Sequence, residues 1–149
     1  MVTATAVQDN FTVKEFITES PDNMELVDGQ LVEKNGATLK HGKIQSSLGC
    51  AWANYRNFSK QGGKFYISPP CCTNQNIRRP DVAYLTPELV AQFGNLATLP
   101  QSFPLIAEIV SPTDIAEDVF LKAQEYLASS CQEVWLVFPE SHLIFVMTQ

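Results

Sequence analysis

An apolar run at Pro104–Val110 limits the folds that this sequence can adopt. Its residues, PLIAEIV, do not alternate between apolar and polar, as the residues of a half-exposed strand would. Such a run is typical of a strand that is buried on both faces of a sheet. Glu108 interrupts it, and a charge inside a buried strand needs a partner. The run therefore predicts a sheet that is covered on both sides and holds an acid near its centre.

The first part of the chain predicts a hairpin ahead of this sheet. Residues 1–10 are small and polar without periodicity, so we expect a flexible tail. A capping box at residues 12–15 predicts a short helix. In MELVDGQLVEK, Asp28-Gly29 separates two short apolar runs, which is typical of a tight β-hairpin. Glu25 is therefore expected on a strand.

Apolar spacing and chain breakers predict the remaining elements. We expect a polar loop at 73–79 and a capped helix that begins after Ser111-Pro-Thr-Asp114 and runs to about residue 130. The other expected elements are helices at 39–58 and 88–93 and strands at 64–68, 80–85, 104–110, 133–138 and 143–147. This order predicts an α/β (α+β) fold, with a mixed central sheet flanked by helices.

Length and composition narrow the class of protein. The chain has 149 residues, enough for one core, so we expect a single domain over residues 11–149. Its net charge of -6 argues against broad, nonspecific attraction to duplex DNA. The four cysteines form no CxxC pair, and no signal sequence or long apolar stretch is present. We therefore expect a cytoplasmic protein with reduced thiols and no membrane association.

Three charged side chains suit phosphodiester hydrolysis. A divalent cation neutralises charge in the transition state and activates a water, and Mg²⁺ is held by hard oxygen ligands. Asp81 begins one predicted strand and Glu108 lies within another, so adjacent strands would bring the two carboxylates together. The backbone carbonyl of Ile109 is a candidate third ligand. Lys122, about two turns into the next helix, is placed to orient the water or the phosphate.

Each of these residues also has a structural interpretation. Asp81 would cap the loop that holds Arg78 and Arg79. Glu108 would be a buried acid satisfied by its neighbours. Lys122 would pair with Asp118, four residues earlier on the same helix face.

Several ordered motifs resemble one known family. RRPDVAYL, LIAEIVSPTD and KAQEYLASSCQEVWLV, preceded by MELVDGQLVE and the helix with His41, resemble the Uma-type restriction-endonuclease family, which is abundant in cyanobacteria. This family belongs to the PD-(D/E)xK nuclease superfamily. The resemblance implies a restriction-endonuclease-like fold and endonuclease activity on nucleic acid, mainly DNA, with Mg²⁺ or Mn²⁺.

The resemblance also assigns roles to single residues. It implies that Asp81 of the RPD motif and Glu108 of the ExxSP motif are metal ligands. Val110 stands where the superfamily has the lysine of ExK, and Lys122 is the implied substitute. Glu25 matches an upstream acid that binds a second metal or orients water, although a surface position on the hairpin is the alternative.

Three further basic side chains are weaker candidates for contacts with a nucleic acid. His41 is a candidate phosphate contact or a helix cap, and Arg78 and Arg79 would steer a phosphate backbone unless they are solvated.

The chain departs from the family pattern in two ways. Relatives have WLVDP where this chain has Phe138, and they continue through further C-terminal strands that we expect to be missing here. Two alternatives to an endonuclease follow: an inactive binding or interaction module with the nuclease fold, and a homodimer formed through the last strand. A further set of lysines is a candidate basic surface: Lys40, Lys43, Lys60 and Lys64.

Overall fold

The computed structural model describes residues 10–34 and 38–149. Apart from Asn10, the predicted tail lies outside the described residues. The helices are α1 (Val13–Glu19), α2 (Leu39–Ser59), α3 (Pro87–Phe93) and α4 (Ala116–Leu127). The strands are β1 (Met24–Val27), β2 (Gln30–Glu33), β3 (Lys64–Ile67), β4 (Cys71–Cys72), β5 (Ile77–Arg78), β6 (Val82–Leu85), β7 (Leu105–Ile109), β8 (Glu133–Phe138) and β9 (Leu143–Thr148).

The larger sheet is mixed, as predicted. Its strand order is β3-β6-β7-β8-β9, with β7 in the middle. Strands β7 and β8 are parallel and are joined through α4, whereas the other neighbours are antiparallel. The predicted buried strand, with its central acid, is thus the central strand of this sheet.

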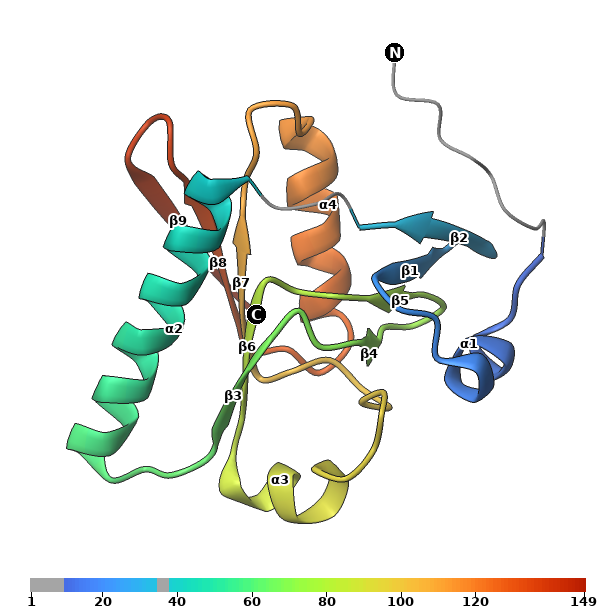
Figure 1. Cartoon of the computed structure of the whole chain (residues 1–149), viewed down its shortest axis with the longest axis horizontal. Coiled ribbons are helices and arrows are strands. Elements are labelled where there is room, and N and C mark those ends of the chain that lie inside the picture. The colour runs from blue at the N-terminus through green and yellow to red at the C-terminus, as the bar shows by residue number, and fades with distance from the viewer. Residues whose placement is uncertain (1–9, 35–37) are drawn as a thin grey trace.

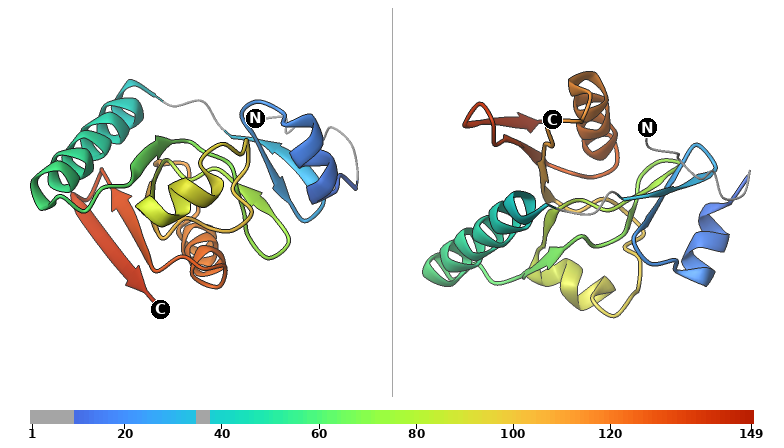
Figure 2. Two further views of the ribbon diagram at one scale, coloured as in Figure 1. Left: turned by 90° about the horizontal axis from the view of Figure 1, so that it is seen from below. Right: turned by 45° about the horizontal axis from the view of Figure 1, so that its top comes forward.

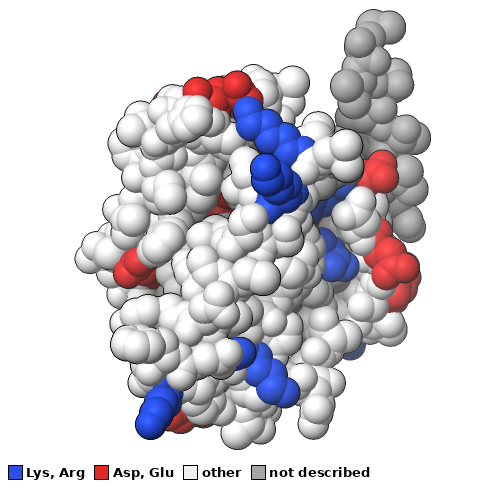
Figure 3. Space-filling view, turned by 60° about the vertical axis from the view of Figure 1, so that its left-hand side comes forward, with Lys and Arg blue, Asp and Glu red and all other residues white. Residues whose placement is uncertain are grey.

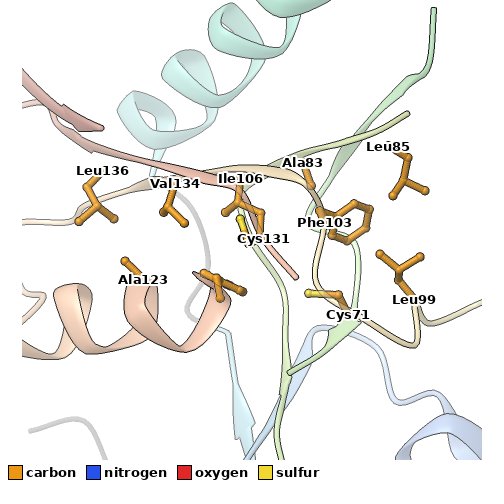
Figure 4. Close-up of a cluster of buried hydrophobic side chains, with 11 residues drawn as sticks. Cys71, Ala83, Leu85, Leu99, Phe103, Ile106, Ala123, Cys131, Val134 and Leu136 are labelled. Carbon is orange, nitrogen blue, oxygen red and sulfur yellow. The ribbon is translucent and has the colours of Figure 1, made fainter. Parts of the chain in front are cut away.

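Helices α2 and α4 cover opposite faces of the larger sheet (Figures 1 and 2). On one face, Trp52 of α2 packs against Val82 and Ala107. On the other face, Ala123 of α4 belongs to a cluster that includes Ile106, Val134 and Leu136 of the sheet (Figure 4). Burial of both faces removes apolar side chains from water, which explains why the strand has no polar alternation.

A smaller sheet, β2-β1-β5-β4, holds the N-terminal hairpin beside the main sheet. The hairpin turns at Asp28 and Gly29, whose φ angles are 50° and 79°, as the predicted tight turn requires. Leu26 of β1 pairs with Ile77 of β5. The expectation of a plain loop at 73–79 was therefore wrong at its end, because tertiary pairing with β1 makes a short strand there.

The start of α4 also differs from the prediction. The helix begins at Ala116, and its N-cap residue, Ile115, makes no side-chain capping bond. Asp114 Oδ2 instead accepts a hydrogen bond from the Ser111 backbone N–H at 2.8 Å. Asp114 thus closes a turn that precedes the helix.

Strand β9 lies at the edge of the larger sheet, with Leu143, Ile144, Phe145 and Val146 about half exposed. Pairing of this edge with a second copy stays a prediction. No helix within residues 10–34 and 38–149 has the length and apolar character needed to cross a bilayer.

Candidate active site

Asp81 and Glu108 lie opposite each other on neighbouring strands. The antiparallel register of β6 and β7 pairs Val82 with Ala107. Continued by one residue, this register sets Asp81 against Glu108, and such cross-strand partners have Cα atoms about 5 Å apart. Both acids are buried, with exposed fractions of 2% for Asp81 and 9% for Glu108. The structure therefore brings together the two carboxylates that the sequence singled out.

Asp81 is surrounded by hydrogen-bond donors. Its Oδ2 accepts the Ile109 backbone N–H at 2.7 Å and lies 3.3 Å from His41 Nε2, while its Oδ1 lies 2.9 Å from Lys34 Nζ. Burial opposes ionisation, but the hydrogen bond with His41 and the charge of Lys34 outweigh it, so the pKa of Asp81 is lowered. Asp81 is therefore an ionised carboxylate at neutral pH.

Glu108 is held through one of its two oxygens. Its Oε1 accepts a hydrogen bond from the Tyr126 hydroxyl at 2.7 Å and lies 3.0 Å from Lys122 Nζ. Burial raises the pKa of Glu108, and the charge of Lys122 opposes this effect. Oε2 accepts no hydrogen bond from the described residues, which leaves an oxygen free for a ligand.

Lys122 joins Glu108 to Glu25 of the hairpin. Its Nζ lies 3.2 Å from Glu25 Oε1, which also accepts the Arg79 backbone N–H at 2.8 Å. Burial lowers the pKa of the Lys122 ammonium, but the charges of Glu108 and Glu25 outweigh burial and raise it. Burial alone would raise the pKa of Glu25, but the charge of Lys122 and the hydrogen bond from Arg79 outweigh burial, so the pKa of Glu25 is lowered. The alternative partner of Lys122, Asp118, forms no ion pair with it among the described residues.

Protein acceptors engage both loop arginines. Arg78 forms a two-pronged ion pair with Glu125, at 2.7 Å for Nη2, and its Nη1 lies 3.6 Å from Glu25 Oε2. Arg79 donates to three backbone carbonyls, those of Met24, Ser68 and Pro21. Arg78 thus joins β5 to α4 and to the hairpin, and Arg79 joins the hairpin to the segment that follows β3.

Three residues of this neighbourhood were absent from the sequence-based site: Lys34, Tyr126 and Glu125. Lys34 follows β2, and only the fold reveals its contact with Asp81. Glu125 accepts hydrogen bonds from Thr73 and Asn76 as well as Arg78. Glu125 and Tyr126 lie three and four residues after Lys122, so helical spacing would have placed all three on one face.

A pocket of about 660 Å³ opens beside Glu108. Six residues of the site line it: Glu25, Arg78, Glu108, Ile109, Lys122 and Glu125. Asp81 does not line this pocket and instead faces Lys34 and His41. The accessible carboxylate is therefore that of Glu108, with Asp81 behind it.

The donor set fits a hard divalent cation that keeps waters or substrate oxygens. Residues 10–34 and 38–149 contain no cluster of three His, Cys, Asp or Glu side chains that would enclose a metal. Mg²⁺ rarely has such a cage and usually takes one or two carboxylates. Asp81 Oδ1 is buried and accepts no hydrogen bond of normal geometry, although the Lys34 ammonium lies beside it. That ammonium occupies a position suited to a cation.

Comparisons with known proteins agree with this architecture. The family model named Uma2, described as "Putative restriction endonuclease", matches residues 11–149. A solved structure from Anabaena variabilis, titled as a putative nuclease belonging to DUF820, has a TM-score of 0.80 and 19% sequence identity. The match covers 93% of this chain and 79% of that chain. A comparison with curated proteins finds no significant match.

Proposed function

The chain belongs to the Uma2 family of restriction-endonuclease-like proteins, and from this premise we propose that it is a metal-dependent endonuclease. Its substrate would be a nucleic-acid phosphodiester, with DNA as the first choice. The observation that carries the proposal is the placement of Asp81 opposite Glu108 on β6 and β7, with Lys122 on Glu108.

Asp81 and Glu108 would hold Mg²⁺ or Mn²⁺ together with the Ile109 carbonyl. The N–H and C=O groups of one strand residue lie on the same edge, and the Ile109 N–H points to Asp81. When bound, the cation would neutralise phosphate charge and lower the pKa of a water. The remaining ligands would be waters and substrate oxygens.

The other residues have positioning and charge roles. Lys122 is charged, and from Glu108 it would reach a water or a phosphate oxygen at the mouth of the pocket. Glu25 holds the ammonium from its other side, and the Tyr126 hydroxyl fixes the Glu108 carboxyl group. His41 fixes Asp81 through its Oδ2. Such preorganised charges stabilise a transition state more than mobile ones do.

Cleavage assays test the proposal. Purified protein is incubated with supercoiled, linear and single-stranded DNA in Mg²⁺ or Mn²⁺. We expect cleavage that chelation abolishes and that Glu108→Gln lowers by roughly a hundredfold or more. The exposed Glu88→Gln is the matched control and should cleave like the wild type. Equal activity of wild type and Glu108→Gln would reject the assigned site.

One observation favours a second candidate, a noncatalytic binding module with the same fold. Phe138, which stands where relatives have an acid, packs with Phe120 and Phe145, so it contributes to an aromatic cluster rather than to a charged site. This candidate predicts binding of nucleic acid or protein without cleavage in either metal. Cleavage that depends on Glu108 rejects it.

A further inference from the structure

Basic residues are strongly segregated along this acidic chain. Residues 34–80 contain eight of the ten Lys and Arg residues and none of the 16 Asp and Glu residues. The rest of the chain has only two basic residues, Lys14 and Lys122, and all of the acids. Although the net charge of the chain is -6, this one segment therefore carries an excess of positive charge, and it includes the whole of α2.

Helix α2 begins directly beside the candidate active site. His41 in its first turn lies 3.3 Å from Asp81, and Gln45 Nε2 donates to the Asp81 backbone carbonyl at 2.7 Å. The exposed Lys40 and Lys43 stand on either side of His41 in the sequence. Lys40 pairs with the exposed Glu140, whereas no salt bridge among the described residues involves Lys43. The N-terminal end of α2 therefore lies next to the buried Asp81.

The far end of α2 is also basic and presents aromatic rings. Lys60 and Lys64 follow the helix and are exposed. Tyr55 and Phe58 have exposed fractions of 64% and 87%. With 21 residues, α2 spans about 30 Å. Figure 3 shows basic side chains toward the upper and lower parts of this side of the molecule, with largely uncharged surface between them.

We propose that the outer side of α2 binds a single-stranded nucleic acid and leads it to the Asp81–Glu108 site. The lysines at the two ends of the helix contact its phosphates, and Phe58 stacks on an unpaired base. Grooves and faces that bind single strands combine such cations with exposed rings, whereas paired bases offer no free face for stacking. The identity of the ligand rests on the proposed function.

The composition of α2 disfavours a membrane as the partner. A helix that lies on a bilayer presents an apolar face to the lipid and a basic face to water. In α2 the large apolar residue Trp52 packs inward against the sheet. The exposed apolar side chains of α2, Leu39, Tyr55 and Phe58, lie toward its two ends. Polar positions, among them Ser47 and Asn54, separate the two ends, so α2 has no continuous apolar face for a bilayer.

The test measures binding of the full chain to a fluorescent single-stranded oligonucleotide of about 15 nucleotides, with EDTA present to stop cleavage. Lys43→Gln and Lys64→Gln should each weaken binding and reduce the slope of log K against log salt by about 0.7. The matched control, Lys14→Gln, removes an exposed charge on α1 and should leave both values unchanged. Phe58→Ala should lower affinity by roughly tenfold without changing the salt slope.

Three results would overturn the inference. The first is an effect of Lys14→Gln equal to that of Lys43→Gln. The second is equal affinity for duplex and single strand together with no effect of Phe58→Ala. The third is lysine-dependent binding to anionic vesicles that exceeds binding to the oligonucleotide. Glu88→Gln leaves both α2 and the candidate site intact and should bind like the wild type in EDTA. Absence of cleavage together with this binding pattern would contradict the proposed activity and support the α2 surface. Cleavage that the α2 variants do not affect would support the proposed activity and contradict the α2 surface.

Discussion

Lys122 Nζ lies 3.0 Å from Glu108 Oε1, which joins the middle of α4 to the central strand of the sheet. The lysine comes 14 residues after the glutamate, whereas an ExK motif would place it two residues after. Tyr126, one turn further along α4, contacts the same carboxylate oxygen. Helix α4 therefore places an ammonium group and a hydroxyl group against Glu108.

Lys122→Met should destabilise the fold, because it leaves Glu108 and Glu25 buried without their shared cation. Removal of one partner from a buried ion pair costs about 3 kcal/mol or more. The free energy of unfolding by urea measures this cost. Adding Glu25→Gln to Lys122→Met removes one of the two buried charges that have lost their partner. The double variant should therefore lose less unfolding free energy than the sum of the two single losses. Strict additivity would contradict the direct coupling of Lys122 and Glu25.

Glu125→Gln should remove a contribution to stability that depends on pH. Burial raises the pKa of Glu125, but hydrogen bonds from Arg78 and Thr73 outweigh it and lower the pKa below the ordinary value of 4.5. An acid whose folded pKa is lowered stabilises the fold above its unfolded pKa and loses this effect as pH falls through the folded value. The difference in unfolding free energy between wild type and variant should be largest near neutral pH and should shrink below about pH 4.5. The exposed Glu88→Gln should show no comparable difference, and a difference for Glu125→Gln that stays constant down to acid pH would contradict the assigned ion pair.

Lys34→Met should make the protein depend more strongly on a divalent cation. The Lys34 ammonium balances the Asp81 charge at 2.9 Å, so its loss leaves a buried carboxylate without that partner. We expect a lower melting temperature without metal and a larger upward shift on addition of Mn²⁺ than in the wild type, because a ligand of the native state stabilises by mass action. Lys14→Met is the matched control. An identical Mn²⁺ shift in all three proteins would show that Lys34 and the cation do not share Asp81.

Local sequence patterns predicted most of the fold because its main elements carry strong local signals. The run at Pro104–Val110 predicted a strand buried on both faces, and Asp28-Gly29 predicted the hairpin, and both are present. Strands β4 and β5 were not predicted, since each has only two residues and forms through pairing within the small sheet. Their pairing depends on contacts between segments far apart in the sequence.

The residues of the candidate site also divide into those that a local sequence signal indicates and those that only the fold reveals. Asp81 and Glu108 were found through strand position and motif, and the register of two adjacent strands sets them opposite each other. Lys34 was not found, because it reaches Asp81 across 47 positions of the chain with no spacing rule to connect them. Glu125 carried a usable helical signal beside Lys122, but its partner Arg78 comes from the distant β5.

Binding of Mn²⁺ tests the central claim, that Asp81 and Glu108 together hold a divalent cation. The paramagnetic signal of free Mn²⁺ is followed during titration with wild type, Asp81→Asn, Glu108→Gln and the control Glu88→Gln, with and without an uncleaved oligonucleotide. We predict uptake by the wild type and the control, and loss of this uptake in both site variants. Uptake by Asp81→Asn and Glu108→Gln equal to that of the wild type, or no uptake by the wild type even with the oligonucleotide, would contradict it.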